Sequence, residues 1–241
     1  MIHNPTDEDL ARADAAIVRA AYPVDRKLLD RMPALKVIAR TGVGTDLVDV
    51  AEANRRGIPV VITPGSNTAS VAEGVFSHLL ALVKKLSTLT ALVRDGRWNE
   101  RTAVYVGDLE GFTLGIIGYG RIGRRVARIA EAFDLNVLAF DPFADVPAGI
   151  RSETVEDLLL RSDFVTLHVP LTPENHNLIN AERIALMPAG AILINCSRGG
   201  LVDLDAAHGA LLTGQLAGLG LDVYDPEPPA HHPSSTTRTS S

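Results

Sequence analysis

Three glycines near the middle of the chain have a spacing that could bind a phosphate group. They lie in the segment Gly118-Tyr119-Gly120-Arg121-Ile122-Gly123. A short apolar run, residues 114–117, precedes the segment, and a stretch with helical periodicity follows it. Glycines at such a strand-to-helix turn let the backbone approach a pyrophosphate, and the helix N-terminus offers unpaired N–H groups. The alternative is that these glycines serve only the packing of helix against strand.

A carboxylate follows the next expected strand at the position where a ribose would lie. Asp141 comes directly after the apolar run 137–140 and eighteen residues after Gly123. A carboxylate there accepts hydrogen bonds from the adenosine ribose hydroxyls and repels a 2′-phosphate. The glycines and Asp141 together predict a site for NAD rather than NADP. The alternative is that Asp141 only caps a turn.

The elements that must position these residues alternate along the chain. Short apolar runs predict strands at 15–18, 36–39, 59–62, 114–117, 137–140, 164–167, 192–194 and 219–223. Helical periodicity predicts helices at 24–32, 48–55, 71–95, 122–133, 155–161, 181–187 and 205–212. Continuous apolar strands that alternate with helices are typical of parallel sheets covered on both faces. The expected fold class is therefore α/β, with a doubly wound parallel sheet.

Composition restricts the classes of partner. The chain has 241 residues, a formal net charge of −6 and no cluster of basic residues, so we expect no nucleic-acid partner. Its polar start does not resemble an export signal, and its apolar runs are shorter than the ~18 residues that span a bilayer. We therefore expect a cytoplasmic protein without a membrane partner. Cys196 is the only cysteine, so no intrachain disulfide can form.

The helix expected at 71–95 is much longer than the others and divides the chain. We place a small α/β domain at 1–69, a nucleotide-binding domain at 70–229 and an aberrant or disordered tail at 230–241.

Several ordered motifs resemble one family, the D-isomer-specific 2-hydroxyacid dehydrogenases, which include phosphoglycerate dehydrogenases and glyoxylate/hydroxypyruvate reductases. Besides the glycine loop, the motifs are Arg40-Thr41-Gly42-Val43-Gly44-Thr45-Asp46, Thr63-Pro64-Gly65-Ser66-Asn67-Thr68, Ser70-Val71-Ala72-Glu73, His168-Val169-Pro170-Leu171-Thr172, Asn195-Cys196-Ser197-Arg198-Gly199-Gly200 and Asp222-Val223-Tyr224-Asp225-Pro226-Glu227-Pro228. The resemblance runs to Pro229. It implies a Rossmann-type sheet for NAD and a smaller flavodoxin-like α/β substrate domain.

The resemblance also implies which residues contact the substrate. Arg198 would bind the carboxylate and carbonyl of a 2-oxo acid, because its planar guanidinium group can donate two hydrogen bonds at once. The backbone N–H groups of Val43 and Gly44 would contact the same carboxylate, although an ordinary glycine turn is an open alternative. Glu227 would hydrogen-bond the histidine that moves the hydroxyl proton and keep its pKa high.

Further residues would line the cofactor. By resemblance Asp222 contacts the nicotinamide carboxamide, with a turn cap as its alternative, and Cys196 and Ser197 lie beside the ring. We expect Cys196 to be inert because no base partner is evident. His168 would lie with Pro170 beneath the adenosine half, so we assign it a packing role and no catalytic one.

The proton-transferring histidine of the family has no counterpart in the sequence. It belongs to a Thr-Pro-His element about two dozen residues beyond the position of Glu227, and fourteen residues follow Glu227 here. His231 and His232 match an exposed turn and lack a third ligand for a metal. We expect the substrate domain to be truncated at both ends, since the family has a further strand and helix at the start and a returning C-terminal segment.

The sequence of the tail suggests a hypothesis for its origin. Removal of one base from a family-like coding segment can produce residues 233–241 followed by a stop codon, if GC-rich codons are chosen. Resequencing that found no neighbouring frame for Thr-Pro-His would contradict this frameshift.

We expect an NAD-dependent oxidoreductase that reduces a small 2-oxo acid such as hydroxypyruvate, glyoxylate or 3-phosphohydroxypyruvate. Its activity would be impaired by the missing histidine. The alternatives are an NAD-binding sensor or corepressor-like module without catalysis, or an inactive frameshifted fragment. The segment from Val71 and the loop around Trp98 resemble the family's dimer contact, so we expect a homodimer.

Overall fold

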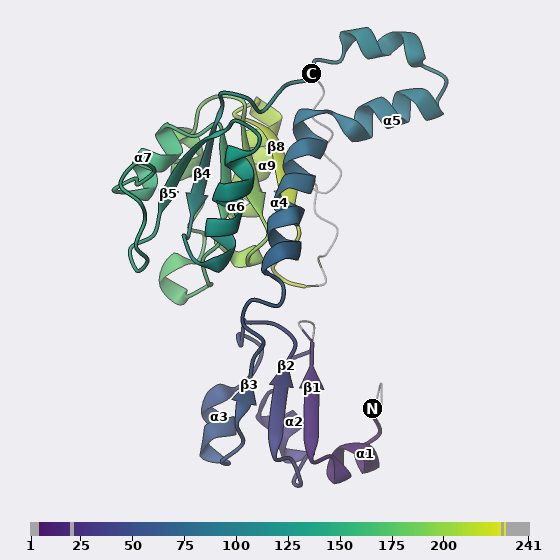
Figure 1. Cartoon of the computed structure of the whole chain (residues 1–241). Helices are drawn as coiled ribbons and strands as arrows, with labels where there is room; N and C mark the ends of the chain where they lie inside the picture. The colour runs from purple at the N-terminus through teal and green to yellow at the C-terminus, as the bar shows by residue number, and fades with distance from the viewer. Residues whose placement is uncertain (1–4, 20–21, 228, 230–241) are drawn as a thin grey trace. The chain divides into compact units, whose positions relative to one another are not determined.

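The computed structural model describes residues 5–19, 22–227 and 229 of the 241 (Figure 1). The chain divides into two compact units, Met1–Asn67 and Thr68–Ser241. We call them unit 1 and unit 2 and describe each by itself.

Unit 1 is a three-stranded parallel sheet with the order β1-β2-β3. Its elements are α1 (Asp7–Arg12), β1 (Ala15–Val18), α2 (Arg26–Asp30), β2 (Val37–Arg40), α3 (Val50–Arg55) and β3 (Val60–Val61). One apolar cluster joins side chains of all three helices to Ala16, Val18, Ile38 and Val60 of the sheet. All three helices therefore cover the same face.

The helix α1 was not predicted, because its residues show no apolar periodicity. Leu10 is its only buried residue. The helix is instead stabilised at its start, where the side chains of Thr6 and Asp9 form a capping box.

Unit 2 contains a five-stranded parallel sheet with the order β5-β4-β6-β7-β8. The strands are β4 (Thr113–Ile117), β5 (Asn136–Phe140), β6 (Phe164–Leu167), β7 (Ala191–Asn195) and β8 (Leu216–Leu221). A single bridge from Ala139 to Arg151 adds a short segment outside β5. The amide of Ala139 donates to the carbonyl of Ile150 at 2.7 Å, and the amide of Ser152 donates to the carbonyl of Ala139 at 2.9 Å. With this segment, which the sequence analysis missed, the strand order is that of the dinucleotide-binding Rossmann fold.

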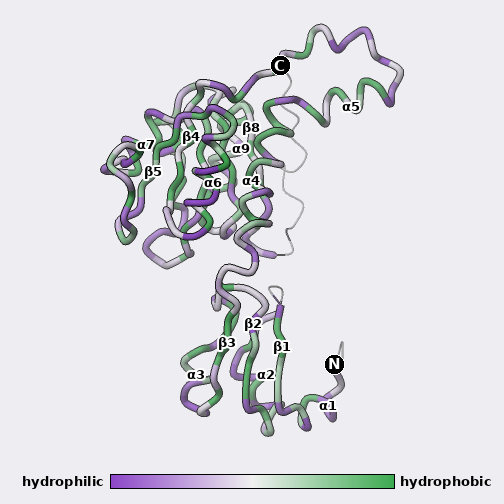
Figure 2. Tube along the Cα trace, viewed as in Figure 1, coloured by the Kyte–Doolittle hydropathy of each residue, from purple (hydrophilic) through white to green (hydrophobic). Residues whose placement is uncertain are grey.

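Helices cover both faces of this sheet (Figure 1). On one face α4 (Thr68–Val83) and α6 (Arg121–Glu131) pack in one apolar cluster, and on the other α7 (Val155–Leu160), α8 (Ala181–Leu186) and α9 (Leu204–Thr213) pack in a second. Figure 2 shows strands coloured mainly as hydrophobic between helices of mixed character. The expected doubly wound α/β class is confirmed.

The prediction of one continuous helix at 71–95 is wrong. It is broken into α4 and α5 (Leu86–Arg94), which are bent by 57°. Lys85 takes a left-handed conformation with φ of 50°. The ammonium group of Lys84 donates to the carbonyl of Gly107 at 2.7 Å, and the amide of Gly107 donates to the carbonyl of Val83 at 3.1 Å. The returning chain therefore satisfies the end of α4 and stops it there.

Between these contacts the chain forms an excursion, residues 86–106, which we call the arm. It contains α5 and the 3₁₀ helix η1 (Trp98–Ala103), and its exposed apolar side chains are Leu86, Val93, Trp98, Tyr105 and Val106.

Two of the expected strands have wrong boundaries. The last strand begins three residues earlier than 219, because Gly218 and Gly220 interrupt the apolar run without interrupting the pairing. It ends at Leu221, two residues before the expected end, so Asp222 follows the strand. The strand expected at 59–62 is reduced to Val60–Val61.

In the part of the chain that the structure describes, no single helix combines the length and hydropathy needed to cross a membrane. By these criteria α4 and α5 qualify only as a bent pair.

The left-handed residue at the break gives the first prediction. Replacing Lys85→Gly should raise the free energy of unfolding of unit 2 by about 1 kcal/mol, because glycine adopts positive φ without a steric cost. The neighbouring variant Lys84→Gly should lower it, because Lys84 has an amide bonded to Leu80 within the helical ladder and an ammonium group bonded to the carbonyl of Gly107. Urea titration followed by circular dichroism measures both, and a Lys85→Gly protein less stable than wild type would contradict the assignment.

Candidate functional site

The expected residues of unit 2 come together because each follows the carboxyl end of a parallel strand. Gly118 follows β4, Asp141 follows β5, His168 follows β6, Cys196 follows β7 and Asp222 follows β8. Parallel strands place these ends on one edge of the sheet. β5 and β6 lie on opposite sides of β4, so the glycine loop stands at the point where ligands bind in such sheets.

The three glycines of the loop differ in what an added side chain would meet. Gly118 has φ of 100°, and a Cβ there would lie 2.5 Å from the carbonyl oxygen of His168. A Cβ on Gly123 would lie 2.1 Å from the carbonyl oxygen of Gly118, so α6 can approach β4 only without one. A Cβ on Gly120 would meet no atom within 4 Å. Gly118 and Gly123 are required by the turn, whereas Gly120 leaves open space beside it.

The start of α6 suits an anion. Gly120 is its N-cap and makes no side-chain capping bond, and the first turn, which begins with Arg121 and Ile122, contains no acidic residue. Unpaired N–H groups and the positive end of the helix dipole therefore lie next to the space at Gly120. This cradle fits the pyrophosphate of a dinucleotide.

Asp141 fastens the glycine loop to the end of β5. One carboxylate oxygen accepts the amide of Tyr119 at 2.8 Å, and the other accepts the amides of Phe143 at 2.8 Å and Ala144 at 3.0 Å. The backbone thus fixes a negative charge beside the loop, where the sequence placed the ribose contact. Phe143 beside it is 98% exposed.

His168 is held as a neutral imidazole. Burial lowers its pKa to about 4. Its Nε2 lies 3.2 Å from the hydroxyl of Thr166, and its enclosed Nδ1 has no hydrogen-bond partner among the described residues. Pro170, two residues further, is exposed, and its carbonyl accepts the side-chain amide of Asn175 at 2.8 Å.

The turn after β7 is shaped by Asn195, which the sequence analysis did not single out. Its buried side-chain amide donates to the carbonyl of Arg198 at 2.7 Å, and its Oδ1 accepts the amide of Ser197 at 3.0 Å. Within this turn burial, and secondarily the charge of Asp222, raises the pKa of Cys196 to about 12. The thiol is therefore protonated and a poor nucleophile.

Gly199 brings Arg198 and the loop of Glu227 together. A Cβ on Gly199 would lie 2.0 Å from the carbonyl carbon of Tyr224, so the two backbones are in direct contact. Arg198 donates from Nη1 to the carbonyl of Ser197 at 2.7 Å. Glu227 is exposed and accepts the amide of Tyr224 through Oε1 at 3.0 Å. The sequence signal for this contact was the Gly-Gly pair after Arg198.

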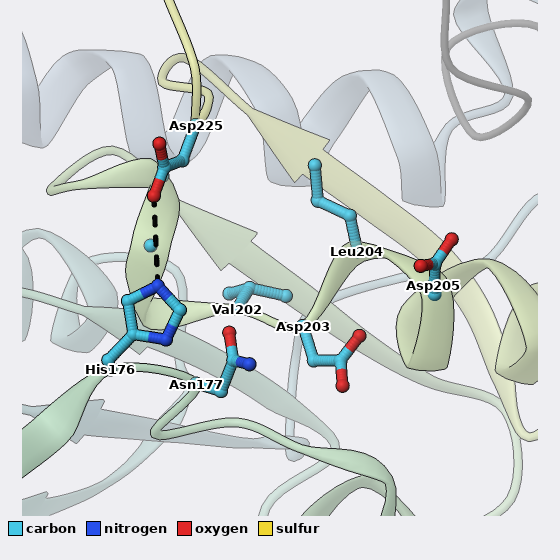
Figure 3. Close-up of a pocket in the computed structure, with 9 residues that line it drawn as sticks. His176, Asn177, Val202, Asp203, Leu204, Asp205 and Asp225 are labelled. Carbon is cyan, nitrogen blue, oxygen red and sulfur yellow. Dashed lines mark ion pairs between the residues drawn. The ribbon is translucent and has the colours of Figure 1, made fainter.

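A hollow of about 230 Å³ lies at this contact, lined by Gly199, Gly200 and seven residues from neighbouring segments (Figure 3). His176 and Asp225 face each other across part of it, with Nε2 and Oδ2 3.8 Å apart. The sequence analysis did not predict this hollow. Across the described ranges no group of three or more His, Cys, Asp or Glu residues could hold a metal ion.

Val43 and Gly44 lie in unit 1, in the loop after β2. The guanidinium of Arg40 donates from Nε to the carbonyl of Gly44 at 2.8 Å, and the amide of Gly42 donates to the hydroxyl of Thr63 at 2.9 Å. These bonds fix the loop on which Val43 is exposed. The predictions for His231, His232 and the tail 230–241 lie outside the described residues.

The fold and the glycine loop define a dinucleotide-binding protein of the Rossmann type. Comparison with known proteins makes this specific, because a family model described as "D-isomer specific 2-hydroxyacid dehydrogenase, NAD binding domain" matches residues 76–239. The chain belongs to the D-isomer-specific 2-hydroxyacid dehydrogenase family, and its cofactor is NAD.

The similar proteins are longer than this chain. D-3-phosphoglycerate dehydrogenase of Methanocaldococcus jannaschii is 41% identical over 234 residues, which are 95% of this chain and 44% of that protein. Glyoxylate reductase of Thermococcus litoralis is 40% identical over 231 residues, 92% of this chain and 70% of the reductase. The crystal structure of D-lactate dehydrogenase from Aquifex aeolicus with NAD and lactic acid matches with a TM-score of 0.83 and 36% identity, over 92% of this chain and 68% of that one.

The glycine loop predicts that two alanine variants affect different properties. Gly123→Ala should lower the free energy of unfolding of unit 2 by about 1–3 kcal/mol, because its Cβ meets backbone. Gly120→Ala should lower stability by less than about 1 kcal/mol, because alanine is a poorer N-cap than glycine, but it should weaken NADH binding at least tenfold, because its methyl group fills the cradle. Urea titration and calorimetry measure the two effects. Unchanged NADH affinity in Gly120→Ala would show that the cofactor does not pass there.

The partly buried His168, whose Nδ1 is enclosed, predicts a loss of stability in mild acid. Its folded pKa of about 4 is below the ordinary 6.5, so its contribution is present above pH 6.5 and is lost as pH falls through 4. The loss should be on the order of 2 kcal/mol. His168→Gln should remove that part of the pH dependence, whereas His176→Gln, at an exposed histidine, should keep it. Urea midpoints between pH 7 and 4 test this, and equal slopes in the His168→Gln and His176→Gln proteins would contradict it.

Proposed function

We propose that unit 2 binds NAD along the carboxyl edge of its sheet and that the chain acts on the CH–OH group of a small D-2-hydroxy acid, or reduces the matching 2-oxo acid. The observation that carries this proposal is the gathering of the glycine loop, Asp141 and the Arg198 turn on one sheet edge. Hydroxypyruvate, glyoxylate and 3-phosphohydroxypyruvate are the candidate substrates. The names of the two curated relatives above support this substrate class.

In this proposal the residues at the carboxyl edge of the sheet would hold the cofactor. The amides of Arg121 and Ile122 bind the pyrophosphate, and Asp141 accepts from the ribose hydroxyls. His168 and Pro170 lie beneath the adenosine half. The nicotinamide end is contacted by Cys196, Ser197 and Asp222. Bound NAD supplies or accepts the hydride, while the high pKa of Cys196 keeps its thiol out of the chemistry.

Arg198 is the proposed substrate anchor. Its guanidinium carries a permanent positive charge and can donate to both the carboxylate and the carbonyl of a 2-oxo acid. The turn made by Asn195 fixes the backbone from which Arg198 extends. Val43 and Gly44, in the loop after β2, are proposed to donate backbone N–H groups to a substrate carboxylate.

Glu227 is proposed to orient and polarise the imidazole that moves the proton. No Thr-Pro-His element follows it within these 241 residues. A missing general acid/base costs about 10²–10⁴-fold in rate. We therefore propose that these 241 residues alone bind NAD but catalyse slowly.

The proposal assigns residues 1–69 to the substrate domain and 70–229 to the NAD domain. It assigns the arm to a homodimer contact, because the arm presents Leu86, Val93 and Trp98 to solvent. Light scattering tests the dimer, and a monomer at every concentration would count against it.

The first test is calorimetry with NADH, combined with assays of glyoxylate and hydroxypyruvate reduction in the same sample. Tight binding with slow or undetectable turnover is the expected result. Fast turnover would show that another group donates the proton. A folded protein that does not bind NADH would overturn the proposal.

Substrate anchoring by Arg198 can be measured without turnover. Arg198→Gln should weaken binding of oxamate, a 2-oxo acid analogue, to the NADH complex by about ten- to a hundredfold, because a charge-assisted pair of hydrogen bonds is lost. The dissociation constant of NADH should stay within about twofold. The control Arg161→Gln, which removes an exposed arginine paired with Asp157, should change neither constant. Equal oxamate affinity in Arg198→Gln would remove Arg198 from the substrate site.

A further inference from the structure

The segment that follows β5 forms neither helix nor strand, so its backbone needs other hydrogen-bond partners. We call residues 141–146 the ribose loop, because they begin with the proposed ribose contact, Asp141. The carboxylate of Asp141 accepts two amides of this loop. Two carbonyl oxygens further along, those of Asp145 and Val146, accept N–H groups of arginine side chains. Charged side chains therefore fix both ends of the ribose loop.

Arg124 of α6 connects the ribose loop with the glycine loop. Its Nε donates to the carbonyl of Tyr119 at 3.1 Å, and its Nη2 donates to the carbonyl of Asp145 at 3.0 Å. The guanidinium carbon also lies 4.9 Å from the centre of the Tyr119 ring, a favourable position for a cation over an aromatic face. One side chain thus holds two loops that are separate in the sequence.

The carboxylate of Asp141 is part of the same set of contacts. Its Oδ2 accepts the amide of Tyr119 at 2.8 Å, while the carbonyl of Tyr119 is bound by Arg124. The side chains of Tyr119 and Val146 are both buried in the apolar cluster that includes α6. A continuous path of contacts therefore runs from Asp141 through Tyr119, Arg124 and Asp145 and returns along the ribose loop. The position of the carboxylate depends on Arg124 through this path.

Arg151 binds the other end of the ribose loop. It donates to the carbonyl of Val146 from Nε at 3.1 Å and from Nη2 at 2.6 Å. Its backbone is itself fixed, because Arg151 forms the bridge to Ala139 of β5. Arg151 thus holds the end of the loop to the sheet, whereas Arg124 holds the loop to the start of α6.

The position of Asp141 matters because a carboxylate distinguishes the two nicotinamide cofactors by its distance from the ribose. It accepts hydrogen bonds from the ribose hydroxyls of NAD and repels the 2′-phosphate of NADP. Repulsion between charges decreases as they separate. A carboxylate that is held in place therefore excludes NADP more strongly than one that can move away. An arginine that touched the 2′-phosphate would have the opposite effect and favour NADP.

We infer that Arg124 is a positioning residue for the choice of cofactor: by holding the ribose loop to the glycine loop it fixes the Asp141 carboxylate and so favours NAD over NADP. The inference rests on the proposed binding of NAD along this edge of the sheet. Arg124 acts through Tyr119 and Asp145, whose carbonyl groups it binds, and not by contact with the cofactor.

The experiment measures the dissociation constants of NADH and NADPH for the full 241-residue chain by calorimetry. Arg124→Gln should raise the NADH constant about tenfold, because charge-assisted hydrogen bonds that hold the loop are lost. It should raise the NADPH constant by no more than about threefold, because the repulsion by Asp141 weakens at the same time. The ratio of the NADPH constant to the NADH constant should therefore fall about threefold or more.

Two further variants keep the test open if Arg124→Gln does not fold. Arg124→Lys keeps the charge but loses the planar group that reaches both carbonyl oxygens, so its ratio should lie between those of wild type and Arg124→Gln. Arg151→Gln loosens the other end of the ribose loop and should lower the ratio by a smaller factor. Circular dichroism and the calorimetric stoichiometry show whether each variant is folded.

Two controls separate positioning from other roles. Arg128→Gln removes an exposed arginine one turn further along α6 and should leave the ratio unchanged. In an Asp141→Asn protein, Arg124→Gln should change the ratio by less than about twofold, because the carboxylate through which Arg124 acts is gone.

The inference is overturned if Arg124→Gln raises both constants by the same factor, since its role is then only structural. It is also overturned if the NADPH constant rises more than the NADH constant, because Arg124 then binds a 2′-phosphate, or if Arg128→Gln lowers the ratio equally. A folded wild-type protein that binds no NADH would overturn the proposed function. NADH binding with the same ratio in wild type and Arg124→Gln would overturn this inference alone.

Discussion

The carbonyl oxygen of Gly118 occupies the place where a side chain on residue 123 would otherwise be. A Cβ at that position would stand 2.1 Å away. This contact brings the first turn of α6 against the end of β4, and the buried side of α6 then packs on the sheet through Val126, Ala127 and Ala130. Asp141 closes the arrangement by bonding the amide of Tyr119. The anion cradle therefore depends on one missing methyl group and one carboxylate.

The two units solve the problem of covering a parallel sheet differently. In unit 2 the order β5-β4-β6-β7-β8 reverses direction at β4, so successive crossovers cover both faces and the reversal creates the crevice for the ligand. In unit 1 the order advances without reversal, and one face is left open. The same connection rule thus produces a nucleotide site in one unit and an uncovered surface in the other.

The sequence predicted those features that depend on local chemistry. The fold class and the glycine loop at the end of β4 followed from continuous apolar runs and from glycines at fixed spacing, and the family followed from the resemblance of several ordered motifs. The features it missed depend on contacts between distant residues. The break at Lys85 depends on the returning Gly107, and the role of Asn195 depends on a turn that only the folded chain defines. The bridge at Arg151 is a single pairing, too short to leave a periodic signal. The start of β8 was misplaced because Gly218 pairs by its backbone alone.

The turn after β7 contains the chain's only thiol, buried at the end of a central strand. A reagent that modifies cysteine can reach it only when this edge of unit 2 opens, because burial both shields the sulfur and keeps it protonated. The rate at which Cys196 is labelled therefore measures how often this edge of unit 2 opens, and no probe has to be introduced. Cys196 is thus a natural reporter at the place where we propose that the nicotinamide ring binds. A ligand that keeps this edge closed is expected to slow the labelling of the thiol.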